Sequence, residues 1–159
     1  MVRWLTPAED RAWRGYRRLR TMLDLQLARD LAADSGLSES DYDVLSTLSE
    51  APDDRWRARA LGHRLLWSSS RLAHHVGRME RRGLVRREAH PSDGRGAVVA
   101  LTPDGRGVLA AAAPLHVESV RRHLLDVLTP AQVETLAELT EAVLARLDPP
   151  RPAAPPPPA

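Results

Sequence analysis

The sequence contains no cysteine, which excludes disulfide bonds, thiolate metal sites and thiol redox sensing. Lysine, asparagine, isoleucine and phenylalanine are also missing, so all 23 basic side chains are arginine. No apolar run reaches the roughly 18 residues of a membrane-spanning helix, and the first residues lack the apolar segment of a secretory signal. We therefore expect a cytoplasmic protein without membrane contact, which is associated with the nucleoid when it binds DNA.

Motifs of the common enzyme classes are missing as well. The sequence has no G-x-S-x-G, P-loop, H-E-x-x-H or dinucleotide fingerprint, so we expect neither an enzyme nor a cofactor. What is present is a chain of 159 residues that is 43% apolar, enough to bury the core of one domain.

Charge is distributed unevenly along the chain. The formal net charge is −4 over residues 1–54, +8 over residues 55–95 and −2 over residues 96–159. A basic segment between acidic ones is typical of a polyanion-binding unit inside a larger scaffold. Charge alone leaves a second interpretation open, a solvated arginine-rich face.

Helix signals dominate the sequence. Three Thr-Pro pairs predict helix starts, because Thr caps a helix well and Pro is tolerated at its first position. Together with apolar residues at three- and four-residue spacing, they predict helices over about residues 7–35, 39–50, 57–66, 68–82, 103–125 and 130–147. Pro114 is expected to kink or interrupt the fifth of these.

Between the fourth and fifth helices the pattern changes. The segments LVRREA and AVVALT predict two strands, and the turn-forming HPSDGRG between them predicts a β-hairpin with a long loop. After the last helix, residues 148–159 are rich in proline and are expected to form a disordered tail. The fold class is therefore mainly α with a small β-hairpin wing (α+β).

Helix, short helix, turn, helix and hairpin, in this order, indicate a winged helix-turn-helix domain. If Leu72, Val76 and Met79 face the core, the opposite side of their helix is free to contact double-stranded DNA. The candidate contacts of this recognition helix are Ser68, Ser69, Ser70, Arg71, His74 and Arg78. An ordinary polar surface helix is the alternative.

The hairpin loop supplies a second group of candidates. Arg95 lies between two glycines at its tip, a shape suited to a narrow minor groove. Asp93 is expected to fold back and hold Arg95 or another arginine. A plain turn with an Asp-Gly signal is the alternative.

At these residues the sequence closely resembles the MarR family of bacterial transcriptional regulators. The resemblance is carried by GLVRREAHPSDGRGAVVALTPDGRGVL, which is similar to the family's wing and following helix. LSESDYDVLSTLSEAP resembles its second helix, and LLWSSSRLAHHVGRMERRGLV its recognition helix. Several motifs in the family's order make the resemblance specific over about residues 6–147.

The resemblance implies a homodimer on a pseudo-palindromic DNA site, with repression as the usual mode of action. It implies that residues 1–36 and 103–147 form a helical dimerisation region and residues 37–102 the winged helix-turn-helix region. Many members also release DNA on binding a small aromatic anion. Candidates for such an effector pocket are Trp13, Tyr16, Arg17, Tyr42 and His116, although aromatic residues at helical spacing usually belong to a core.

A metal site finds little support. His116 and His123 share a helix face but lie about 10 Å apart along the axis, too far to hold one ion together. We expect no metal ligands. One alternative function stays open, a dimeric small-molecule or metal sensor whose winged domain has little specific DNA binding.

Overall fold

The structure is a computed structural model that describes the backbone of residues 1–90 and 93–147 and the side chains of residues 1–89 and 97–147. The Pro-rich tail from residue 148 onward lies outside the described residues. The chain divides into two compact units, one over residues 1–120 and one beginning at Arg121.

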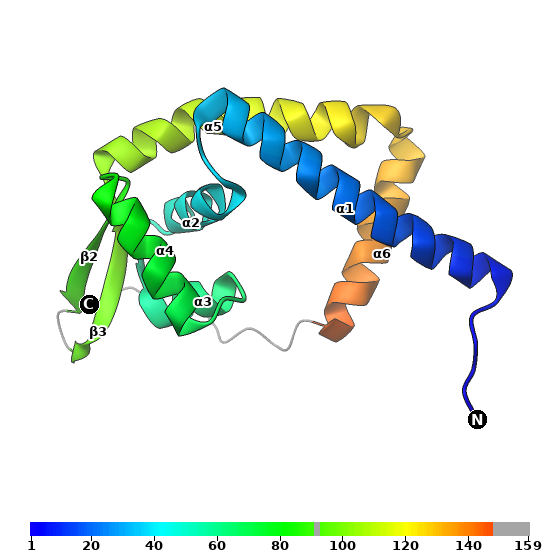
Figure 1. Cartoon of the computed structure of the whole chain (residues 1–159), viewed down its shortest axis with the longest axis horizontal. Coiled ribbons are helices and arrows are strands. Elements are labelled where there is room, and N and C mark those ends of the chain that lie inside the picture. Colours follow the sequence, from blue (N-terminus) through cyan, green and yellow to red (C-terminus); the bar gives the residue numbers. More distant parts are fainter. Residues whose placement is uncertain (91–92, 148–159) are drawn as a thin grey trace. The chain divides into compact units, whose positions relative to one another are not determined.

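Most described residues are helical, and a small antiparallel sheet completes the fold, which confirms the mainly α class with a β wing (Figure 1). The elements in chain order are α1 (Pro7–Ser35), α2 (Glu39–Ser49), β1 (Arg55–Arg57), α3 (Ala58–Arg64), α4 (Ser69–Arg81), β2 (Val85–His90), β3 (Asp93–Leu101), α5 (Pro103–His123), the 3-10 turn η1 (Leu125–Val127) and α6 (Pro130–Leu147).

The predicted caps set the first two helices. Thr6 and Glu9 form a capping box before α1, and Ser38 and Asp41 form one before α2. Between the helices, Gly36 takes the left-handed conformation with φ 69°, which closes α1 as a glycine can without strain. These short-range signals explain why both helix starts agree with the sequence prediction.

The sheet contains one strand that the sequence pattern does not predict. Its order is β1-β3-β2, with β3 paired antiparallel to both neighbours. In β1, Trp56 lies opposite Val99, in a segment that the helix prediction entered at Arg57. Three residues are too few to show an alternating pattern, and β1 forms because β3, distant in sequence, offers it an edge.

The core of the first unit lies between the helices and the inner face of the sheet. Fully buried side chains from α2, α3, α4, β2 and β3 contribute to it, for example Leu45, Leu61, Met79, Val85 and Val99. Leu72, Val76 and Met79 are buried as the helix pattern predicts. Burying them fixes which side of α4 faces outward.

Of the two expected effects of Pro114, a kink or an interruption, the interruption does not occur, and α5 runs from Pro103 to His123. The alanines at 110–113 before it are strong helix formers, so the helix tolerates one lost hydrogen bond. The helix also ends two residues earlier than expected, because the chain enters the η1 turn at Leu125.

The second unit contains η1 and α6. Arg121 forms an ion pair with Asp126 at 3.0 Å, and Thr129 and Gln132 cap the start of α6 reciprocally. No residue of α6 is buried in the single chain, although its apolar residues share one face. No helix among the described residues is long and apolar enough to span a membrane.

Candidate nucleic-acid interface

The turn before α4 places the start of the helix at the surface. Ser68 caps α4, and its Oγ accepts a hydrogen bond from the Arg71 backbone N–H at 3.2 Å. Leu66, two residues earlier, has φ 56° and is 90% exposed. Ser69 and Ser70 in the first turn of α4 are exposed as well, and the N-terminus of a helix is suited to bind a phosphate oxygen.

The sequence-predicted residues all lie at the surface of α4: Ser70, Arg71, His74 and Arg78 on the side away from the core, and Ser68 and Ser69 where the helix begins. Ser68, Ser69, Ser70, Arg71, His74 and Arg78 are all exposed. Gly77 lies between His74 and Arg78 in the sequence and is half-buried. A Cβ at Gly77 would lie 3.4 Å from Arg87 Nη2. The outer side of α4 therefore presents hydroxyl, imidazole and guanidinium groups over about three turns.

Trp67 is a residue of this surface that the sequence analysis did not select. The guanidinium of Arg71 lies over its ring, 4.2 Å from the ring centroid. The Trp67 ring also meets the buried His75 edge-on, with centroids 5.3 Å apart. An aromatic residue four positions before an arginine at a helix start was the available signal, and it predicts a cation–π pair.

A polar network connects the recognition helix to α2. Asp41 Oδ2 accepts a hydrogen bond from Arg82 Nη1 at 2.7 Å, and Asp41 Oδ1 lies 3.1 Å from His75 Nε2. On the other side of the ring, His75 Nδ1 lies 2.7 Å from Arg78 Nη2. Asp41 and His75 are buried, whereas Arg78 is exposed.

The electrostatics of this network favour a neutral His75 and a charged Asp41. Burial lowers the pKa of His75, Asp41 opposes this, and Arg78 and Arg71 add to the lowering. Burial raises the pKa of Asp41, but the hydrogen bonds from Arg82 and Ser38 outweigh it, so this pKa lies below its ordinary value. Since arginine has only donors, His75 Nδ1 must be the acceptor toward Arg78, and the ring proton is on Nε2.

Several arginines of the basic segment are neutralised by local carboxylates. Arg87 is held by Glu80 on α4 through its backbone and side chain, at 2.8 to 3.0 Å. Glu88 pairs with Arg55 and Arg86 in the sheet. The described arginines of this segment that form no ion pair with a carboxylate are Arg57, Arg59, Arg71, Arg78 and Arg81. Positive charge is thus concentrated on α3 and the outer side of α4.

The wing candidates can be placed only by their backbone. Asp93 begins β3 and pairs with His90, next to an irregularity in the ladder between Ala89 and His90. Arg95 also lies within this strand, so the prediction of a long loop with Arg95 at its tip is wrong. The strand extends through these residues because it pairs with β2. The side chains of Asp93 and Arg95 lie outside the described residues, and their contacts stay a prediction.

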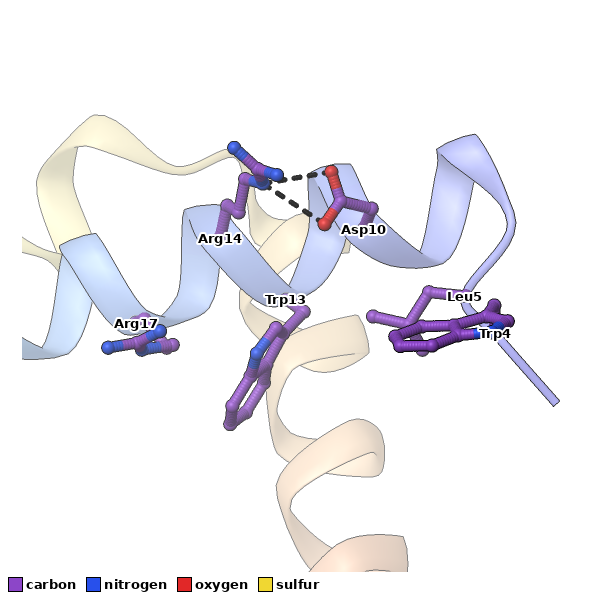
Figure 2. A pocket seen from close by; sticks show the side chains of 6 residues that line it. All are labelled: Trp4, Leu5, Asp10, Trp13, Arg14 and Arg17. Atoms are coloured by element: carbon purple, nitrogen blue, oxygen red, sulfur yellow. Dashed lines mark hydrogen bonds and ion pairs between the residues drawn. The ribbon is translucent and has the colours of Figure 1, made fainter. Parts of the chain in front are cut away.

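The candidate effector residues fall into two separate groups. Trp13, Tyr16 and Arg17 share the exposed side of α1, where the two rings stack at 6.0 Å and Arg17 lies 5.9 Å from the centroid of Trp13. Figure 2 shows the side chains that line a surface pocket here: Trp4, Leu5, Asp10, Trp13, Arg14 and Arg17. Trp13 and Tyr16 are half exposed rather than part of the core of the single chain.

The second group lies between α2 and α5. The rings of Tyr42 and His116 meet with centroids 4.5 Å apart. Burial raises the pKa of Tyr42, and it also raises the pKa of the neighbouring Asp43. His116 Nδ1 is buried and has no hydrogen-bond partner among the described residues. The structure does not bring this pair together with Trp13 and Tyr16 in one described pocket.

No group of three or more His, Asp or Glu side chains within the described part of the chain could hold a metal ion.

An exposed helix that follows a short helix and turn, packed beside a three-stranded antiparallel wing, defines the winged helix-turn-helix class. A family model described as MarR family matches residues 35–96. The transcriptional regulator HosA of Escherichia coli O111:H- is 30% identical over 131 residues, which cover 82% of this chain and 95% of HosA.

Solved structures agree with this match. AbsC, a MarR family transcriptional regulator from Streptomyces coelicolor, is 40% identical with a TM-score of 0.87, over 92% of this chain and 98% of AbsC. Sco3205, from the same organism and family and solved in complex with DNA, is 41% identical with a TM-score of 0.89, over 94% of each chain. The chain belongs to the MarR family of transcriptional regulators.

Proposed function

We propose that the protein is a sequence-specific regulator that binds double-stranded DNA as a homodimer, represses transcription from a pseudo-palindromic operator and is released from it by a small aromatic anion. The observation that carries the proposal is the outer side of α4, where Arg71 and Arg78 stand exposed without a carboxylate partner. An α-helix fits the major groove, and a guanidinium forks onto the O6 and N7 of a guanine.

The rest of the surface supports this docking. Ser68, Ser69 and Ser70 at the start of α4 offer hydroxyls and backbone N–H groups to phosphates. The proposal includes the wing strand β3, where Arg95 is predicted to enter the adjacent minor groove and Asp93 to hold it. The relative Sco3205, 41% identical to this chain, was solved in complex with DNA, which supports the same role here.

Uncovered apolar faces support the homodimer. Along α1, Trp13, Tyr16, Leu19, Met22 and Leu25 are each about half exposed and are spread over more than one side of the helix, and only Leu31 of this helix is buried. On α6, Leu139, Val143, Leu144 and Leu147 are more than half exposed. A monomer seldom leaves so much apolar surface in water, so we assign these faces to a second copy of the chain, which would present two recognition helices to one DNA duplex.

The effector is proposed to bind beside Tyr42 and His116. The buried Nδ1 of His116 offers an unused polar atom, and the tilted Tyr42 ring offers an apolar wall for an aromatic ligand. Salicylate is a suitable probe of this chemistry. It should weaken DNA binding by the wild-type protein and leave DNA binding by Tyr42→Ala unchanged.

Selection from a random duplex pool tests the proposed function. The purified protein should recover a motif with two-fold symmetry whose half-sites lie about 10 base pairs apart, one turn of the helix. Arg71→Ala and Arg78→Ala should each relax the preference at particular base positions. Recovery of no motif would contradict sequence-specific recognition, and an unsymmetrical motif would contradict the dimer.

A further inference from the structure

We propose that His75 is a positioning residue for DNA recognition, which holds Arg78 in its reading direction through a hydrogen bond at Nδ1. The inference deepens the proposed function and rests on it. His75 is buried on the inner side of α4 and cannot touch DNA. Its ring nevertheless contacts the exposed Arg78, at 2.7 Å between Nδ1 and Nη2.

Two features fix the ring itself. Asp41 on α2 places Oδ1 3.1 Å from His75 Nε2, and Asp41 is in turn held by Arg82 at 2.7 Å. The Trp67 ring packs edge-on against the other side. Although Asp41 lies this close, His75 Nε2 forms no hydrogen bond of good geometry with a described residue, so the ring is placed by its packing and by the charge of Asp41. Its Nδ1 lies against the guanidinium of Arg78. A long arginine side chain otherwise samples many rotamers, and a fixed acceptor reduces that freedom before DNA arrives.

The arrangement depends on the protonation of His75. The charged groups around the ring are Asp41 and Asp43 from α2, Arg71 and Arg78 from α4, and Arg82 through Asp41. A proton on Nδ1 would replace the lone pair with a second donor, and Arg78 has no acceptor to offer it. Protonation therefore releases Arg78. Its burial and the nearby arginines hold the pKa of His75 below its ordinary value, so the neutral ring is the resting form near neutral pH.

Two substitutions separate the contacts of the ring. The Oδ1 of Asn occupies the position of His Nδ1, so His75→Asn keeps an acceptor for Arg78 and gives up the contact with Asp41. The Nε2 of Gln occupies the position of His Nε2, so His75→Gln keeps a donor for Asp41 and gives up the acceptor. A role in folding alone predicts the same effect on DNA binding from both variants, or a larger effect from Asn.

Two duplexes serve as probes. The selected duplex has roughly 30 base pairs, enough for two half-sites with flanks, and carries the sequence that the wild-type protein selects from a random pool. The scrambled duplex has the same length and composition. His75→Gln should bind the selected duplex about tenfold more weakly than the wild-type protein, a loss that corresponds to one base contact. Its affinity for the scrambled duplex should be unchanged. His75→Asn should stay within about threefold of wild type. Thermal unfolding of both variants reports whether they fold.

A double-mutant cycle tests the role of His75 even if His75→Asn does not fold. Because His75 acts through Arg78, adding His75→Gln to Arg78→Ala should cause no further loss of affinity for the selected duplex. Once the pH falls below the lowered pKa of His75 in the folded protein, the preference of the wild-type protein for the selected duplex should weaken and that of Arg78→Ala should stay unchanged.

The outcomes distinguish two failures. Equal losses in His75→Gln and His75→Asn, or a further loss in the double variant, would overturn the role of His75. A loss in Arg78→Ala with none in His75→Gln would do the same while leaving the proposed function intact. A wild-type protein that prefers no duplex would overturn the proposed function and this inference together.

Discussion

Gly105, on the first turn of α5, lies directly against the backbone carbonyl of Leu84, where the chain enters the wing. A Cβ at Gly105 would overlap the carbonyl oxygen of Leu84 and approach its carbon to 2.9 Å. The Gly105 N–H is also hydrogen-bonded to Thr102 Oγ1, which in turn donates to the carbonyls of Gly83 and Leu84. The start of α5 is therefore joined to the residues that precede β2 by a close backbone contact and by hydrogen bonds.

The first prediction follows from this contact. Gly105→Ala should lower the free energy of unfolding by about 1–3 kcal/mol, because the backbone must shift to admit the methyl group. Gly107→Ala is the matched control, since a Cβ there meets nothing within 4 Å in the same helix, and it should stabilise the protein by about 1 kcal/mol through helix propensity. Urea unfolding measures both, and equal effects would contradict the contact.

Leu66 provides a second prediction about the backbone. It holds φ 56° while its side chain is 90% exposed, so it bears left-handed strain and contributes little packing. Leu66→Gly should raise the free energy of unfolding by about 0.5–1 kcal/mol. The converse change, Gly36→Ala at φ 69° with open space around it, should lower it by about 1 kcal/mol. A destabilised Leu66→Gly protein would show that the side chain packs after all.

Acid should weaken the fold through His75 before it does so through Asp41. The pKa of His75 in the folded protein is lowered chiefly by burial, so below about pH 6.5, the ordinary value, the unfolded chain binds a proton that the native state refuses. The stability that neutral His75 contributes is therefore fully present above about pH 6.5. As the pH falls from there toward the pKa of His75 in the folded protein, the free energy of unfolding decreases by at most about 1.4 kcal/mol per pH unit. The lowered pKa of Asp41 adds a loss only at more acidic pH.

Chemical unfolding at pH values between 7.5 and 5.5 would measure this slope. It should be smaller in His75→Gln, which has no imidazole to protonate. The exposed His63, outside the network, serves as control, and His63→Gln should keep the wild-type slope. An unchanged slope in His75→Gln would contradict the assignment.

The apolar face of α6 gives a test of the dimer. Val143→Asp places a carboxylate in the middle of that face, on a side chain that is 56% exposed in the single chain. The dimer should dissociate, because a charge buried without a partner costs several kcal/mol. Ala145→Asp puts the same charge at nearly the same height on the opposite face and should remain dimeric. Sedimentation equilibrium distinguishes the two, and a dimeric Val143→Asp protein would contradict the assignment.

Local signals explain what the sequence could predict. Thr6 with Glu9 and Ser38 with Asp41 act over three residues, so the helix starts can be identified from the chain alone. The ion pair between Asp41 and Arg82 joins residues 41 positions apart, and no local pattern announces it. The same holds for β1, which exists only through its pairing with β3.

The outer side of α4 was predictable for the same reason, since a period of 3.6 residues with Leu72, Val76 and Met79 inward fixes which residues face outward. The role of His75 was not, because it depends on a tertiary contact with Asp41 on α2. The pair of Trp67 and Arg71, four residues apart, was a local signal that the sequence analysis did not use. In the sequence, His75 is only one of two adjacent histidines.

The most direct test of the account is the affinity of the wild-type protein for its selected duplex compared with a scrambled duplex, measured by fluorescence anisotropy across a salt series. Recognition by α4 should give a preference of about a thousandfold for the selected duplex. Affinity for both duplexes should fall steeply as salt rises, because arginines displace counterions from phosphates. Equal, weak binding to both duplexes at every salt concentration would contradict sequence-specific recognition by α4.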